Sequence, residues 1–88
     1  MSGYAYQEQR PNIFSESGVE MLTKIRDNVR AALKVAGAVR ANEAWKGVSG
    51  SSWDMLACLD YMVEKDEIRE VTSGTWGQHR IFTEPWGD

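Results

Sequence analysis

Cysteine and histidine are nearly absent from this sequence, which contains one of each, Cys58 and His79. One cysteine cannot form a disulfide within the chain, and it cannot supply the several thiolates of a cysteine-based zinc site. General-base catalysis by one histidine would also need a partner that orients the imidazole. We therefore expect no metal, no cofactor and no enzymatic activity. The sequence predicts that Cys58 packs on a helix and that His79 belongs to a hairpin.

Long apolar runs are also lacking. No stretch approaches the ~20 apolar residues that a membrane-spanning helix needs, and residues 1–14 lack the apolar centre of a signal peptide. No membrane partner is expected, and a cytoplasmic location agrees with the lack of a disulfide framework. The 88 residues, of which 42% are hydrophobic and 26% charged, have the composition of one small globular domain.

The charge is small in sum and uneven along the chain, with a formal net value of −3. Residues 24–46 contain six basic and two acidic side chains, whereas residues 54–70 contain six acidic and two basic ones. Such asymmetry often accompanies a binding surface, and the alternative is that each run is the solvated side of its helix.

The hydrophobic spacing predicts where the first helix lies. Residues 1–14 have no periodic pattern and are expected to form a flexible N-terminal arm. Ser17 and Glu20 have the spacing of a capping box, which places the helix start at Ser17. Apolar residues then recur every three or four positions until Gly37, a residue typical of helix C-termini.

Two further helices and a hairpin are predicted after Gly37. A short helix covers residues 41–46, and a serine-capped helix covers residues 52–65. Residues 68–72 and 78–83 have strand-like sequences around a glycine-containing turn. The domain would span residues 15–84, with a short tail at 85–88. We expect the core to contain Leu22, Ile25, Val29, Leu33, Leu56, Leu59, Val63, Ile68 and Ile81.

This order resembles the winged helix-turn-helix superfamily over residues 17–83. The resemblance is in the small and apolar positions: Ala44, the turn Gly47-Val48-Ser49, and Leu56, Leu59 and Met62-Val63 leading into Ile68. It implies an α+β fold of three helices followed by a two-stranded antiparallel wing. A resemblance of this kind indicates fold more than function.

The first functional hypothesis is a small regulatory or accessory factor that binds double-stranded DNA. Lysine and arginine hold phosphates, and serine hydroxyls can add to them. A tryptophan at the hairpin tip could enter a groove or stack on a base. The residues expected to bind nucleic acid are Arg30, Lys34, Arg40, Lys46, Ser49, Ser51, Ser52, Trp76, His79 and Arg80.

The second hypothesis is a winged helix that binds another protein and does not read DNA directly. The third helix has no arginine or lysine before Lys65, although base and phosphate contacts usually need such residues. Its acidic side would instead complement a basic partner or a second copy in a homodimer. The residues expected at that interface are Trp53, Asp54, Tyr61 and Glu64.

Overall fold

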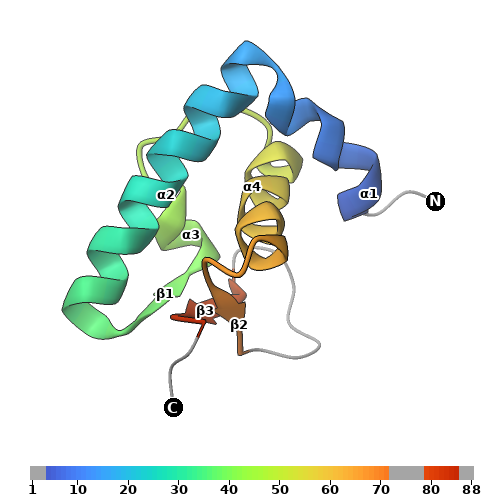
Figure 1. Cartoon of the computed structure of the whole chain (residues 1–88). Helices are drawn as coiled ribbons and strands as arrows, with labels where there is room; N and C mark the ends of the chain where they lie inside the picture. Colours follow the sequence, from blue (N-terminus) through green and yellow to red (C-terminus); the bar gives the residue numbers. More distant parts are fainter. Residues whose placement is uncertain (1–3, 72–78, 86–88) are drawn as a thin grey trace.

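A computed structural model describes residues 4–71 and 79–85 as an α+β fold, which confirms the expected class (Figure 1). The described helices are α1 (Tyr6–Gln9), the 3-10 helix η1 (Arg10–Phe14), α2 (Glu16–Ala36), α3 (Ala41–Ala44) and α4 (Ser52–Glu64). The described strands are β1 (Ala38–Arg40), β2 (Arg69–Glu70) and β3 (Ile81–Thr83). None of the described helices is both long and apolar enough to cross a lipid bilayer.

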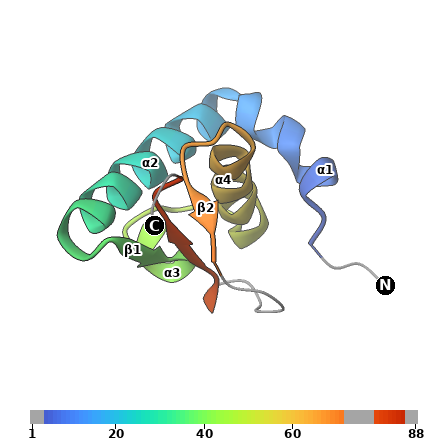
Figure 2. The same ribbon diagram turned by 60° about the horizontal axis from the view of Figure 1, so that its bottom comes forward.

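The N-terminal segment, residues 4–14, is packed and is helical from residue 6 onward, where the sequence suggested a flexible arm. It consists of α1 and η1, and Ile13 in η1 is 1% exposed. Short helical turns of this kind give no hydrophobic period, and they are stabilised by tertiary packing more than by propensity. Both views place α1 beside α4, on the side away from α2 (Figures 1 and 2).

Helix α2 begins two residues earlier than the capping-box pattern predicts. The N-cap is Ser15, whose backbone is extended and whose Oγ accepts a hydrogen bond from the Gly18 amide. Ser17 therefore lies inside the first turn. The reason is η1, which ends at Phe14 and leaves Ser15 as the first non-helical residue. The C-terminal end of α2 is as predicted. Gly37 has a left-handed backbone with φ of 76°, which a glycine adopts without strain.

The predicted hairpin is part of a three-stranded antiparallel sheet with the order β1-β3-β2. The added strand β1 comes from the short link between α2 and α3. In β3 the register differs from the expectation, because Phe82 is fully buried and Ile81 is only partly buried. Neighbouring residues of a strand face opposite sides of a sheet, so Arg80 and Phe82 share the inner face.

The core lies between α2, α4 and the inner face of the sheet. Six of the nine expected core residues are buried, whereas Leu33, Val63 and Ile81 are partly exposed. Ala57 and Cys58 are also fully enclosed, although the helical period places them on the outer side of α4. They are buried because α4 contacts α2 on one side and the N-terminal segment on the other.

Candidate functional site

The link between α3 and α4 is fastened to α2 by one side chain. The Asn28 amide nitrogen donates hydrogen bonds to the backbone carbonyls of Ala44 and Lys46, at 2.8 and 3.0 Å. Gly47 then turns the chain with a φ of 76°. At the end of the turn the Ser51 hydroxyl accepts a hydrogen bond from the Trp53 amide and caps α4. The turn is therefore held in one position against α2.

A shallow hollow opens beside this turn. Its polar lining includes Lys24, Ser49 and Ser51, together with the carboxylates Glu20 and Asp54. Lys24 lies one helical turn before Asn28, so it faces the same side of α2 as the residue that binds Lys46. We use the name turn surface for three exposed residues of this hollow, Lys24, Ser49 and Ser51, together with Lys46 and Ser52, which are exposed in and next to the link. The sequence analysis proposed the last four and did not include Lys24.

The other expected DNA-binding cations do not join the turn surface. Arg30 and Lys34 line a groove on the opposite flank of α2, whose apolar floor includes Met62 and Ile68. Three carboxylates share that groove: Asp66, Glu67 and Glu84. Arg40 lies on β1, where its neighbour Val39 faces the core, so Arg40 is on the outer side of the sheet. The structure thus distributes these cations over several faces.

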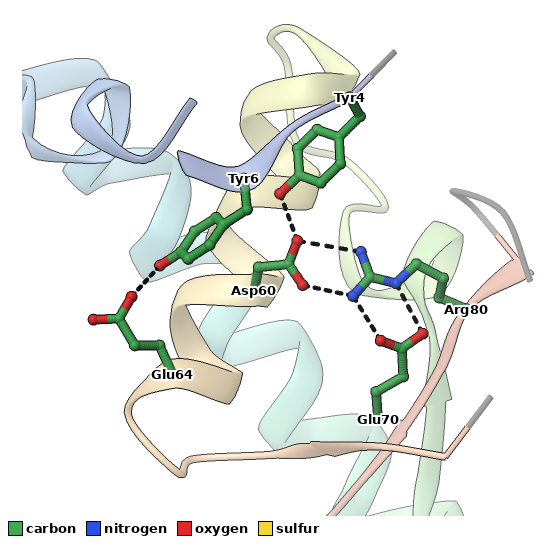
Figure 3. A network of polar contacts seen from close by, with 6 residues as sticks. All are labelled: Tyr4, Tyr6, Asp60, Glu64, Glu70 and Arg80. Carbon is green, nitrogen blue, oxygen red and sulfur yellow. Dashed lines mark hydrogen bonds and ion pairs between the residues drawn. The ribbon is translucent and has the colours of Figure 1, made fainter. Parts of the chain in front are cut away.

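Arg80 forms two ion pairs inside the fold. Its guanidinium is bonded to the carboxylates of Asp60 on α4 and Glu70 on β2, and its side chain is only 12% exposed (Figure 3). Burial alone would lower the pKa of Arg80, but the hydrogen bonds to Glu70 and Asp60 outweigh it and raise the pKa above its ordinary value. Arg80 therefore remains charged and connects the hairpin to α4.

The acidic side of α4 is covered by the N-terminal segment. We call this side the outer face of α4, comprising Asp54, Asp60, Tyr61 and Glu64. The Arg10 guanidinium forms two bonds with the Glu64 carboxylate, at 2.8 and 2.9 Å. The hydroxyls of Tyr4 and Tyr6 donate to Asp60 and Glu64, respectively (Figure 3).

The covering extends along the whole outer face. Asn12 donates a hydrogen bond to the Asp54 carboxylate at 3.0 Å. The Phe14 ring meets Tyr61 edge to face, with ring centroids 5.6 Å apart, and Arg10 lies over both rings. Arg10 therefore brings a positive charge from within the chain to the acidic side of α4. Trp53 is 37% exposed beside these contacts.

The pKa values follow from these bonds. Hydrogen bonds from Arg10 and Tyr6 lower the pKa of Glu64 to about 2. Burial and the bond to Glu64 raise the pKa of Tyr6 to about 12, and burial and the bond to Asp60 raise the pKa of Tyr4 still further above its ordinary range. At neutral pH the Tyr6 hydroxyl is a donor and the Glu64 carboxylate is an ionised acceptor, so the hydrogen bond between them is charge-assisted.

The remaining candidates contribute less to a site. His79 is exposed, and Trp76 lies outside the described residues. Cys58 is buried, and its burial raises the pKa of its thiol to about 12, which keeps it protonated. Within residues 4–71 and 79–85, no group of three or more histidine, cysteine, aspartate or glutamate side chains is arranged to hold a metal ion.

Sequence reasoning missed the residues that cover and support α4. Tyr4, Tyr6 and Arg10 lie in the segment expected to be a flexible arm, and their spacing matches no local pattern. The acidic run of α4 was itself a signal, because carboxylates one turn apart on a helix repel each other unless a donor neutralises them.

Comparison with models of known protein families, with curated proteins and with solved structures gave no match.

Proposed function

We propose that this chain is a winged helix-turn-helix domain that binds the phosphates of duplex DNA through the turn surface. The order of α2, α3 and α4 followed by the β2–β3 hairpin supports the winged-helix assignment. The two short connections after α2 and α3 bring the serine-capped start of α4 next to the basic side of α2.

The observation behind this proposal is the contrast between two surfaces. The outer face of α4, which would have to enter a groove, is acidic and covered by residues 4–14. Lys24 and Lys46 are exposed, and neither has an ion pair within the part of the chain that the structure describes. Open lysines beside serine hydroxyls suit phosphate contacts, which provide affinity without reading sequence.

Two features limit how strongly such a surface binds. Glu20 and Asp54 also line the hollow and would repel a phosphate at close range. Arg80 is committed to Asp60 and Glu70, so the hairpin offers less positive charge than its sequence suggests. Binding is therefore expected to be weak, similar for all duplex sequences and highly dependent on salt.

A salt titration with fluorescently labelled duplex DNA tests the proposal. Lys24→Gln and Lys46→Gln should each weaken binding to every sequence alike and lower the salt slope by about one. Arg30→Gln and Lys34→Gln are matched controls, because they remove the same charge from the opposite flank of α2. They should leave the slope close to that of the unmodified protein.

Two results would overturn the proposal. One is the absence of detectable binding at ~50 mM salt, where even non-specific electrostatic binding is measurable. The other is an equal loss of affinity in all four variants, which would indicate attraction to net charge and not to the turn surface.

A further inference from the structure

The N-terminal strap, residues 4–10, is attached to the domain almost entirely through side chains. Helix α1 contains no buried residue, and its contacts are with α4 and with η1. Its connection to α4 depends on Tyr4, Tyr6 and Arg10, whose rings and guanidinium cover the outer face. The strap contains no fully buried residue, although Tyr4 and Tyr6 pack against the core, so its departure would uncover part of α4 and leave the contacts between α2 and α4 in place.

The next residues, 11–14, are held much more firmly. Ile13 is a core residue, and Asn12 and Ile13 pass so close to Gly18 that a β-carbon there would lie 2.1 Å from the Asn12 carbonyl oxygen. Phe14 contacts Tyr61 from this anchored part. Departure of the strap would thus expose one end of the outer face while residues 11–14 stay in place.

On the exposed surface, the Asp60 carboxylate would keep its orientation. Asp60 is held by two bonds from Arg80, so its carboxylate stays oriented when the Tyr4 hydroxyl is removed (Figure 3). Glu64 lies one helical turn further along the same side and would lose both of its donors, Tyr6 and Arg10. The Asp60 carboxylate, held in place by Arg80, and the Glu64 carboxylate, released from its donors, would favour a ligand with matching donors.

From this arrangement we propose that the outer face of α4 is a docking site for a partner protein's peptide segment that presents tyrosine hydroxyls and an arginine. In the free protein the strap occupies this site as an intramolecular ligand. Because it is tethered, the strap acts at an effective concentration in the millimolar range, and a partner segment must exceed its affinity to displace it. This proposal is independent of DNA binding, which uses the turn surface.

The test uses a synthetic peptide with the sequence of residues 3–11 and the full-length chain with the substitution Arg10→Glu. The substitution places a second carboxylate beside Glu64, so the strap is repelled while α4 is unchanged. The Arg10→Glu chain should bind the peptide at least about tenfold more tightly than the unmodified chain, as measured by NMR titration of the α4 amides. A peptide carrying the same arginine-to-glutamate change should not bind.

Two further variants keep the result interpretable. Lys34→Glu makes the same kind of charge reversal in the groove on the far flank of α2, and it should bind the peptide no better than the unmodified chain. Tyr6→Phe removes one hydrogen bond to Glu64 without adding charge, and it should give an intermediate gain even if Arg10→Glu disturbs folding. Equal peptide affinities in the unmodified, Arg10→Glu and Tyr6→Phe chains would overturn the proposal. Concentration-dependent dimerisation of the unmodified chain, with loss of its own strap contacts, would also overturn it and assign the site to a second copy.

Discussion

Arg80 is the residue whose role differs most between sequence and structure. In the sequence it is a cation in a hairpin, a usual place for a phosphate contact. In the fold it lies on the same side of β3 as Phe82 and pairs with Asp60 and Glu70, and its guanidinium is 5.2 Å from the centre of the Phe82 ring. Removing the arginine from such a group leaves two carboxylates of low exposure without this cation, which is more costly than losing a surface ion pair.

We predict that Arg80→Met destabilises the domain by about 2–4 kcal/mol, somewhat less than the cost for a fully buried pair because both carboxylates keep some exposure. Urea denaturation followed by circular dichroism measures this. Arg30→Met is the control, because Arg30 is exposed, and it should change the free energy of unfolding by no more than about 0.5 kcal/mol. If the two variants were equally stable, Arg80 would have no structural role and would again be available for DNA.

At the scale of elements, the sequence predicted those helix positions that depend on residues close together in the chain. The 3.6-residue period, Gly37 and a serine cap before Trp53 located the long helices, although the start of α2 was predicted two residues too late. The helical start of the chain was missed because α1 and η1 are each too short to show a period and are ordered by contact with α2 and α4. The same omission explains why the helical period placed Ala57 and Cys58 on the outer side of α4, since η1 and α1 cover the part of α4 where they lie.

The choice of site residues had the same limit. Exposure of Lys46 and Ser49 followed from their place in a polar turn, but the pairing of Arg80, Glu64 and Asp54 depends on residues 10 to 54 positions away in the sequence. Sheet register was likewise undetermined, because Ile81 and Phe82 are both apolar and alternation alone does not say which faces inward.

A substitution at Gly18 would test how closely the backbone of η1 packs against the first turn of α2. Its substitution by alanine would place a β-carbon 2.1 Å from the Asn12 carbonyl oxygen, and the obstacle is backbone, which cannot simply rotate away. We predict that Gly18→Ala lowers the free energy of unfolding by about 1–3 kcal/mol or more, despite the better helix propensity of alanine.

Two alanine substitutions in the same turn serve as comparisons for Gly18→Ala. Ser15→Ala should cost about 1 kcal/mol through loss of the cap, and Ser17→Ala should be almost neutral. Thermal and urea unfolding would measure all three. A larger loss for Ser17→Ala than for Ser15→Ala would restore the helix start suggested by the sequence.

At the scale of the whole molecule, the two charged runs differ in how many of their side chains form ion pairs within the chain. Four carboxylates of the acidic run have ion pairs among the described residues: Arg10 pairs with Glu64, Arg26 with Glu67, and Arg80 with Asp60 and Glu70. These contacts connect the N-terminal segment, α2, α4 and the sheet. The basic run keeps exposed cations on several sides of α2 and on β1. An acidic protein can therefore present an open basic surface, although its net charge of −3 suggests otherwise.

The strap should be the first part of the molecule to be released in acid. Because Arg10 and Tyr6 lower the pKa of Glu64 from 4.5 to about 2, the folded state favours the ionised carboxylate. The resulting stabilisation of the strap is fully present above the ordinary pKa of a glutamate, and it is lost as the pH falls from about 4.5 through about 2. We predict that NMR signals of residues 6–10 shift over this range while the amides of Ile25 and Val29, which lie in the core, remain protected from hydrogen exchange.

The control is Glu64→Gln, which has no carboxylate to protonate and should remove most of this pH dependence. If the strap and core signals instead changed together at one pH, residues 4–10 would belong to the same cooperative unit as the domain, and release of the strap alone would not occur.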